Sequence, residues 1–236
     1  MHRSRYAISR LAVGLLFISL GSTIVAGEVQ EHGLWFEQWI CDTFFDGYRP
    51  SSYTQKWDIP AEANTRHGHL PVNPKATKLG TPIGLGDALR QFDVIDDPDS
   101  FILIVGFWEQ STPTTKSWVN TQAVIITPEK WRTLWHPITR PDLLRFDAVI
   151  KDTSLSLEEA RTRAKKIKSE PPFSEAIIQI NPKIDHSQRR LQCSLSFDAF
   201  FDHLLPGVSR ESQSTPTIWN KPIPNVPDTA SRTFKH

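Results

Sequence analysis

The sequence predicts an α/β fold in which a central mixed β-sheet is flanked by helices. Three observations support this prediction. Residues 101–107 (FILIVGF) form a continuous apolar run, which is typical of a central strand covered on both faces. A helical pattern precedes this run at 30–46, and a well-capped helical pattern follows it at 156–168. Helices interleaved with short strands favour a sheet with helices packed against it.

The first helix is expected over residues 30–46, because Phe36, Ile40 and Phe44 recur every four residues and Gly47 suits its C-terminal end. The elements expected between this helix and the central strand are short strands at 55–59 and 70–75, a Gly-rich turn at 79–86, a short helix at 87–92 and a turn at 96–99.

After the central strand, a second buried strand is expected at 122–127, followed by a helix at 129–134 that Pro128 opens. A further helical turn begins at Arg140-Pro141. Ser156 and Glu159 form a capping box for a helix that runs to about residue 168. The last expected elements are a strand at 176–180, a turn at 185–188, a returning strand at 190–195 and a helix at 197–205.

The N-terminus has the pattern of an export signal. Arg3, Arg5 and Arg10 precede an uncharged apolar run at 11–26, which ends in small residues. We therefore expect a signal peptide at 1–27, a single α/β domain at 28–206 and a Pro/Ser-rich, disordered tail at 207–236. The mature protein would be periplasmic or extracellular, without stable membrane insertion. An uncleaved anchor, or a cytoplasmic protein whose start is set too far upstream, are the alternatives.

Composition limits the classes of function. The 236 residues are 39% hydrophobic and 22% charged, which suffices for one substantial core or two small ones. The formal net charge of +1 excludes a global field that recruits nucleic acid or membrane, so such contacts require local clusters. Two cysteines, Cys41 and Cys193, do not make a disulfide framework; buried free thiols are expected, with pairing as the alternative.

One pair of segments has the residue types for phosphate chemistry. Asp58 lies in the short run KWDIP, and Lys75 ends the run LPVNPK, two residues after Asn73. If the two runs pair as a hairpin, a carboxylate and an ammonium group meet at the strand ends. A divalent metal on Asp58 beside Lys75 would suit phosphodiester hydrolysis. The alternative is that Asp58 caps a turn and Lys75 is a solvated strand end.

Together with Glu37 on the opening helix, these residues resemble the PD-(D/E)xK superfamily of restriction endonucleases and related DNA-processing nucleases. The resemblance covers about residues 30–130. It implies a restriction-endonuclease-like fold, a DNA substrate and Mg²⁺ as cofactor. It also implies that Asp58 binds the metal, that Lys75 orients water and stabilises phosphate charge, and that Glu37 is an outer metal ligand.

The chain departs from the family pattern at Asn73, where an Asp or Glu is usual. An Asn offers Mg²⁺ one neutral carbonyl oxygen and no charge, so another carboxylate must compensate. Glu62 and Glu109 are the candidates for this role.

Basic residues form two further groups. Lys183, Arg189 and Arg190 flank the turn at 185–188 and are candidate nucleic-acid contacts, with an ordinary solvated hairpin as the alternative. Lys165, Lys166 and Lys168 are expected on a solvated helix face. The tripeptide Asn-Pro-Lys occurs twice, at 73–75 and at 181–183, and each copy ends an apolar run.

The sequence therefore favours a Mg²⁺-dependent nuclease-like protein that hydrolyses DNA. The alternative is an exported, non-catalytic domain that acts in binding and keeps a degenerate nuclease scaffold. A third hypothesis is an unrelated exported binding protein that uses surface Trp residues and its tail. Sequence motifs of serine hydrolases, zinc proteases, P-loop proteins and dinucleotide-binding proteins do not occur.

Overall fold

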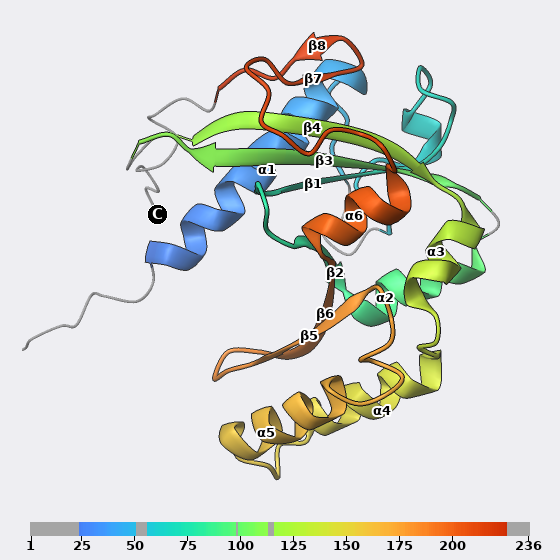
Figure 1. Cartoon of the computed structure of the whole chain (residues 1–236), viewed down its shortest axis with the longest axis vertical. Coiled ribbons are helices and arrows are strands. Elements are labelled where there is room, and N and C mark those ends of the chain that lie inside the picture. The colour runs from blue at the N-terminus through green and yellow to red at the C-terminus, as the bar shows by residue number, and fades with distance from the viewer. Residues whose placement is uncertain (1–23, 51–55, 98, 113–115, 226–236) are drawn as a thin grey trace, which may run out of the picture.

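The computed structural model describes residues 24–50, 56–97, 99–112 and 116–225 (Figure 1). It has a mixed α/β architecture in which small sheets are flanked by helices, as the sequence predicts. Within these ranges, none of the helices combines the length and the apolar character needed to cross a membrane. The predicted export signal covers 1–27, of which residues 1–23 lie outside the described residues.

The first sheet has the strand order β1-β3-β4. Its central strand β3 (Phe101–Gln110) pairs in parallel with β1 (Val72–Lys78) and antiparallel with β4 (Lys116–Ile126). The run at 101–107 is therefore a central strand, as predicted, and all seven of its residues are buried.

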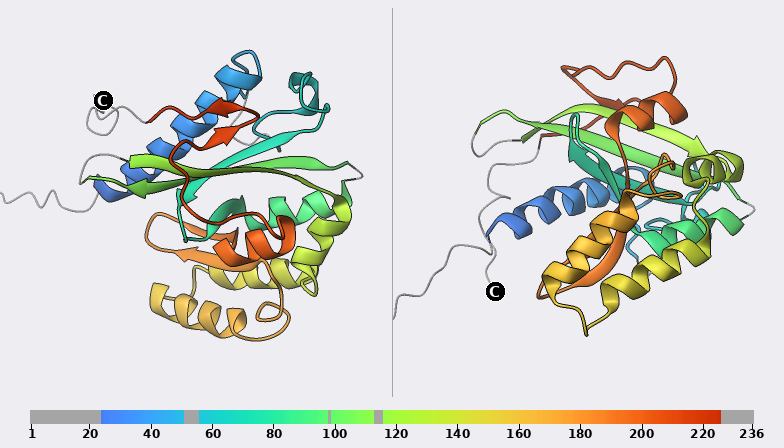
Figure 2. Two further views of the ribbon diagram at one scale, coloured as in Figure 1. Left: turned by 45° about the horizontal axis from the view of Figure 1, so that its top comes forward. Right: turned by 60° about the horizontal axis from the view of Figure 1, so that its bottom comes forward.

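Both faces of β3 are covered (Figure 2). Ile102 and Ile104 pack with Phe36 and Ile40 of helix α1 (Ile24–Phe44). The odd-numbered side chains of β3, from Phe101 to Phe107, belong to the larger core on the other face. The alternation with period two therefore assigns one face of the strand to α1 and the other face to the rest of the molecule.

The second sheet is antiparallel, with β6 (Arg189–Leu195) between β2 (Ile83–Asp87) and β5 (Gln179–Ile184). The strands therefore divide between separate sheets around the predicted central strand, and the assignment of 83–86 to a turn is wrong. Ile83 and Leu85 are buried, while Gly84 and Gly86 occupy the alternate positions. The two glycines hide the strand pattern, and the pairing of β2 shifts register between them.

The remaining helices begin where the sequence places their caps. In each case a side chain just before the helix accepts a hydrogen bond from a backbone N–H of the first turn. The helices and their caps are α2 (Ala88–Phe92) with Asp87, α3 (Pro128–Trp135) with Thr127, α4 (Arg140–Lys151) with Thr139, α5 (Leu157–Lys168) with Ser156, and α6 (Phe197–Leu204) with Ser196. The capping box of Ser156 and Glu159 is confirmed. The helical turn expected at Arg140 continues as the full helix α4. Two short 3₁₀ turns, Ala61–Ala63 and Asp93–Asp96, complete the helical elements.

The strand expected at 55–59 is reduced to one antiparallel bridge between Ile59 and Val72. The two backbone N–H groups and carbonyls of this pair exchange hydrogen bonds of 3.0 and 2.8 Å. Pro60 follows at once and has no N–H to continue a ladder, so the pairing stops there. Residues 51–55 lie outside the described residues.

The tail assignment at 207–236 is wrong over its described part. A small hairpin of β7 (Thr217–Ile218) and β8 (Lys221–Pro222) turns through Trp219 and Asn220, both at positive φ. Ile218 is only 3% exposed and joins the core beside α1. The polar composition of this segment conceals a few apolar residues that dock onto the domain. Residues 226–236 lie outside the described residues.

The two cysteines are free and buried, as expected. Cys41 lies in the core beside α1, whereas Cys193 lies in the core on the other side of the first sheet. Burial raises the pKa of the Cys41 thiol to about 12, so it is protonated at neutral pH.

Candidate active site

Asp58 and Lys75 form an ion pair. Lys75 Nζ lies 2.7 Å from Asp58 Oδ2, although the residues are 17 positions apart in the chain. The bridge between Ile59 and Val72 sets this contact, because Asp58 precedes one bridge residue and β1 continues from the other. The expected meeting of the carboxylate and the ammonium group therefore occurs, through a single bridge rather than a full hairpin.

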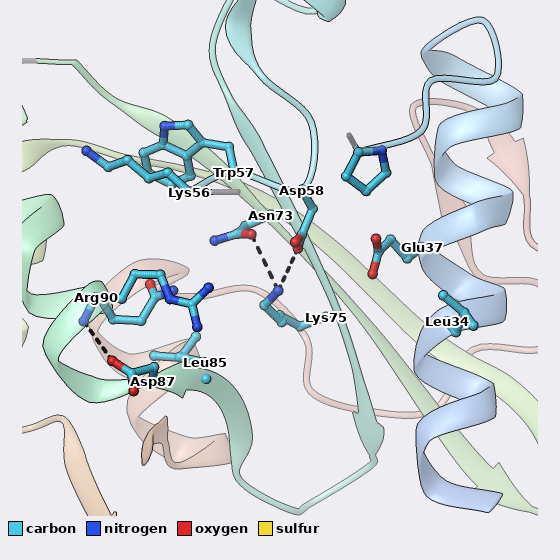
Figure 3. Close-up of a pocket in the computed structure, with 13 residues that line it drawn as sticks. Leu34, Glu37, Lys56, Trp57, Asp58, Asn73, Lys75, Leu85, Asp87 and Arg90 are labelled. Atoms are coloured by element: carbon cyan, nitrogen blue, oxygen red, sulfur yellow. Dashed lines mark hydrogen bonds and ion pairs between the residues drawn. The ribbon is translucent and has the colours of Figure 1, made fainter. Parts of the chain in front are cut away.

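Asn73 and Lys75 lie two positions apart on β1, so their side chains share one face of the strand. Asn73 is 4% exposed, and its Oδ1 lies 3.4 Å from Lys75 Nζ. The ammonium group therefore lies between the Asp58 carboxylate and the Asn73 amide (Figure 3).

Glu37 approaches the same place from α1. Figure 3 shows its carboxylate pointing from the helix toward Asp58 and Lys75. Burial raises the pKa of Glu37, the nearby Asp58 raises it further, and Lys75 partly opposes both effects. The two carboxylates therefore share one electrostatic environment, and a cation between them would stabilise the ionised form of Glu37.

These four residues line a cavity of about 360 Å³. Its wall also includes residues that sequence reasoning missed, namely Lys56, Asp87, Arg90 and Gln91. Asp87 caps α2 by accepting from the Arg90 backbone N–H at 2.9 Å, and Lys56 pairs with Asp97 at 2.5 Å. The pattern at 87–92 indicates a helix start, but nothing in the sequence places that helix beside β1.

Glu62 and Glu109 do not line this cavity. Glu62 is exposed on the 3₁₀ turn Ala61–Ala63. Glu109 lies near the end of β3, where its Oε1 accepts a hydrogen bond of 3.0 Å from Ser212 Oγ. The structure therefore does not bring either residue to Asn73 as the compensating carboxylate, and Glu37 is the acid that accompanies Asp58.

The donor set fits Mg²⁺ more closely than a soft metal. The described residues contain no cluster of three or more His, Cys, Asp or Glu side chains arranged to hold a metal ion. Mg²⁺ commonly takes one or two carboxylates and keeps several waters, so Asp58 and Glu37 are the residues of this cavity that could serve as its ligands. Asn73 adds a neutral carbonyl oxygen at the same cavity.

The three basic residues proposed to contact nucleic acid have different surroundings. The Arg189 guanidinium donates to the backbone carbonyls of Asp152 and, at 3.0 Å, Leu155. It therefore holds the loop between α4 and α5, which is a structural role that the sequence did not indicate. Lys183 and Arg190 are exposed cross-strand partners on β5 and β6.

A scan against protein-family models, a search of curated proteins and a search of solved structures each found no match. The chemistry of the cavity is therefore argued from its own residues. It brings the carboxylates of Asp58 and Glu37, the Asn73 carbonyl oxygen and the Lys75 ammonium group to one pocket, whose wall also holds Asp87, Lys56 and Arg90.

Proposed function

We propose that this protein is a Mg²⁺-dependent nuclease that hydrolyses DNA phosphodiester bonds. The observation that carries the proposal is the contact between Asp58 and Lys75 at the cavity that Glu37 also lines. An acid pair beside a lysine is the combination that phosphodiester hydrolysis needs, because charge must be spread over the phosphoryl oxygens while water attacks.

The residues have distinct roles in this proposal. Asp58, Glu37 and the Asn73 carbonyl oxygen would hold Mg²⁺. Bound Mg²⁺ supplies an activated water and neutralises phosphate charge. Lys75 contacts Asp58 and Asn73 with its ammonium group, which has three N–H donors, so one donor remains for a phosphate oxygen.

The arrangement of elements supports the restriction-endonuclease-like interpretation of the fold. A helix that bears Glu37 packs on a mixed sheet, and the first strand of that sheet bears Asn73 and Lys75. The acid Asp58 precedes this strand in the chain and meets it through the bridge of Ile59 and Val72. The order of acid, strand and lysine is the one that the resemblance implies.

A cleavage assay tests the proposal. Purified full-length protein is incubated with plasmid and linear duplex DNA in Mg²⁺ or in EDTA. Asp58→Asn should lower the cleavage rate by about a hundredfold or more, because it removes the charge that holds the cation. Glu62→Gln is the matched control, since Glu62 lies outside the cavity. Cleavage that survives EDTA, or that Asp58→Asn leaves unchanged, would refute the proposal.

A second candidate is a non-catalytic DNA-binding domain, and the neutral, buried Asn73 favours it. Under this hypothesis the wild-type protein retards duplex DNA in a gel without cutting it. Asn73→Asp would then create the missing charge beside Lys75 and should confer Mg²⁺-dependent cleavage. The two candidates differ at one measurement, the cleavage rate of the wild-type protein.

The N-terminal pattern supports the further proposal that the protein is exported. Basic residues followed by an apolar run and small residues are what a signal peptidase substrate requires. Mass spectrometry of the protein from its native host would find a mature N-terminus close to Glu28. An N-terminus at Met1 would contradict cleavage.

A further inference from the structure

A second pocket lies between α5 and β5, and its wall is strongly basic. It has a volume of about 440 Å³. Its charged lining residues are Arg161, Lys165, Lys168 and Lys183, and its uncharged ones are Ala164, Asn181, Pro182 and Ile184. No acidic residue of the described chain belongs to this wall. The geometry points to a binding site for a phosphate group.

The helix presents its cations as one stripe. Arg161, Lys165 and Lys168 are spaced at i, i+4 and i+7, so they lie on the same face of α5. Like charges at such spacings destabilise a helix unless something opposes them. Lys166, expected with its neighbours on a solvated face, does not line the pocket. The structure therefore divides the lysines of this helix between the pocket and the solvent.

Two of the cations are held in place by neutral groups. The Arg161 guanidinium donates Nε and Nη2 to the carbonyl of Ile184 at 2.9 and 2.8 Å. Lys168 Nζ donates to Asn181 Oδ1 at 2.9 Å, and Asn181 Nδ2 donates to Ser194 Oγ at 2.7 Å. These contacts orient the charges without neutralising them, and both side chains keep N–H donors for a ligand.

Two carboxylates of the adjoining helix start and turn, those of Glu159 and Asp185, are engaged elsewhere. Glu159 belongs to the capping box with Ser156 at the start of α5. Asp185 accepts from Ser187 and Gln188 within the turn between β5 and β6. Burial lowers the pKa of Lys168, and the positive charge of Lys183 lowers it further. Among the described residues, the pocket wall has no acidic side chain that would supply a compensating negative charge. A bound phosphate would supply it.

The second Asn-Pro-Lys tripeptide gives this pocket its strand wall. Asn181, Pro182 and Lys183 line it, just as Asn73 and Lys75 line the cavity of the candidate active site. The charged residues that join the tripeptide in the first cavity are of both signs and include the carboxylates of Asp58 and Glu37, whereas those that join it in the second are all cations. The first set of residues suits a metal ion and the second suits an anion, so this inference does not depend on the proposed nuclease activity.

The proposal is tested by titrating the full chain with inorganic phosphate in a calorimeter. Sodium chloride holds the ionic strength constant, and the measured quantity is the affinity for phosphate. Wild type should show saturable binding. Lys168→Gln and Lys183→Gln should each weaken it by about tenfold or more, because each removes a charge-assisted contact. Lys166→Gln is the matched control and should bind like wild type. Lys183 is exposed, so its variant tests the site even if Lys168→Gln fails to fold.

A second arm with a short DNA duplex identifies the source of the phosphate. If duplex affinity falls with phosphate affinity in the Lys183→Gln variant, the ligand is a nucleic-acid backbone. If only phosphate affinity falls, the ligand is a small phosphorylated molecule. Absence of saturable phosphate binding by the wild-type protein, or an equal loss in Lys166→Gln, would overturn the inference.

Discussion

Phe36 of α1 lies directly against Gly106 of β3: a Cβ atom at position 106 would be 2.7 Å from Phe36 Cε2 and 2.8 Å from Trp118 Cζ3. The helix approaches the sheet this closely only because residue 106 has no side chain. Phe36 is followed directly by Glu37 in the chain. The contact with Gly106 therefore helps to fix the position of the Glu37 carboxylate relative to the cavity.

Gly106→Ala should therefore destabilise the protein by about 1–3 kcal/mol, since the added methyl group overpacks the interface. Urea denaturation followed by Trp fluorescence measures the change. Gly33→Ala is the control, because nothing lies within 4 Å of the added Cβ and Gly33 lies within α1. It should be neutral or stabilising by up to about 1 kcal/mol. Equal effects of the two substitutions would contradict the close approach.

The raised pKa of Glu37 predicts a pH dependence of stability. Between the ordinary value of 4.5 and the raised pKa, the folded state retains a proton that the unfolded state has released. The free energy of unfolding therefore falls as pH rises through this window. Glu37→Gln should remove that part of the dependence, and saturating Mg²⁺ should reduce it in the wild type. Denaturation midpoints at several pH values, with Glu62→Gln as control, measure the effect.

Asp58 and Lys75 form an ion pair, so substitutions of the two residues should have coupled effects on the free energy of unfolding. Their side chains are 28% and 22% exposed, so solvent screens the contact only in part. A double-mutant cycle with Asp58→Asn and Lys75→Gln should give a coupling free energy of about 1 kcal/mol. A cycle between Asp58→Asn and Lys183→Gln, which line different pockets, should give none. Coupling within error of zero for the first pair would mean that the contact does not persist in solution.

The C-terminal hairpin should contribute to stability through Trp219. Its ring stacks on His67 with centroids 3.7 Å apart, and it meets Phe44 edge-on at 4.9 Å. Trp219→Ala should cost about 2–4 kcal/mol, through lost burial and lost aromatic contacts. Val208→Ala, at a partly exposed position in the same segment, should change stability by less than about 0.5 kcal/mol. A Trp219→Ala variant as stable as wild type would indicate that the hairpin does not dock.

Substitutions of the neighbouring residues Arg189 and Arg190 should have different effects on the stability of the protein. Arg189→Ala removes the donor to the Asp152 and Leu155 carbonyls and should destabilise the protein by about 1–3 kcal/mol. Arg190→Ala, at an exposed position of the same strand, should leave thermal stability nearly unchanged. Differential scanning fluorimetry compares them. A larger loss for Arg190→Ala would contradict the assignment.

Local patterns in the sequence predicted the helices well. The capping box of Ser156 and Glu159, and Pro128 in the first turn of α3, act within a few residues, so each signal and its target are close in the chain. The apolar run of β3 predicted a strand covered on both faces for a similar reason, because burial on both sides leaves no polar alternation.

The partition of strands into sheets could not be predicted in the same way. Gly84 and Gly86 remove the side chains that would reveal β2, and its partner β6 lies more than a hundred residues later. The hairpin at 217–222 is not predicted because the polar composition of the segment outweighs two apolar residues, Ile218 and Trp219, whose burial depends on the surface that receives them.

By itself, the sequence determined most of the helices and the central strand, since periodicity and caps act over a limited stretch of chain. It also predicted that Asp58 meets Lys75, but it left open a capped turn and a solvated strand end. Only the tertiary structure decided that Glu37, rather than Glu62 or Glu109, faces that pair, and that Lys183 joins the cations of α5. Those groups come from distant segments, and their convergence depends on how helices pack on sheets, which no local pattern encodes.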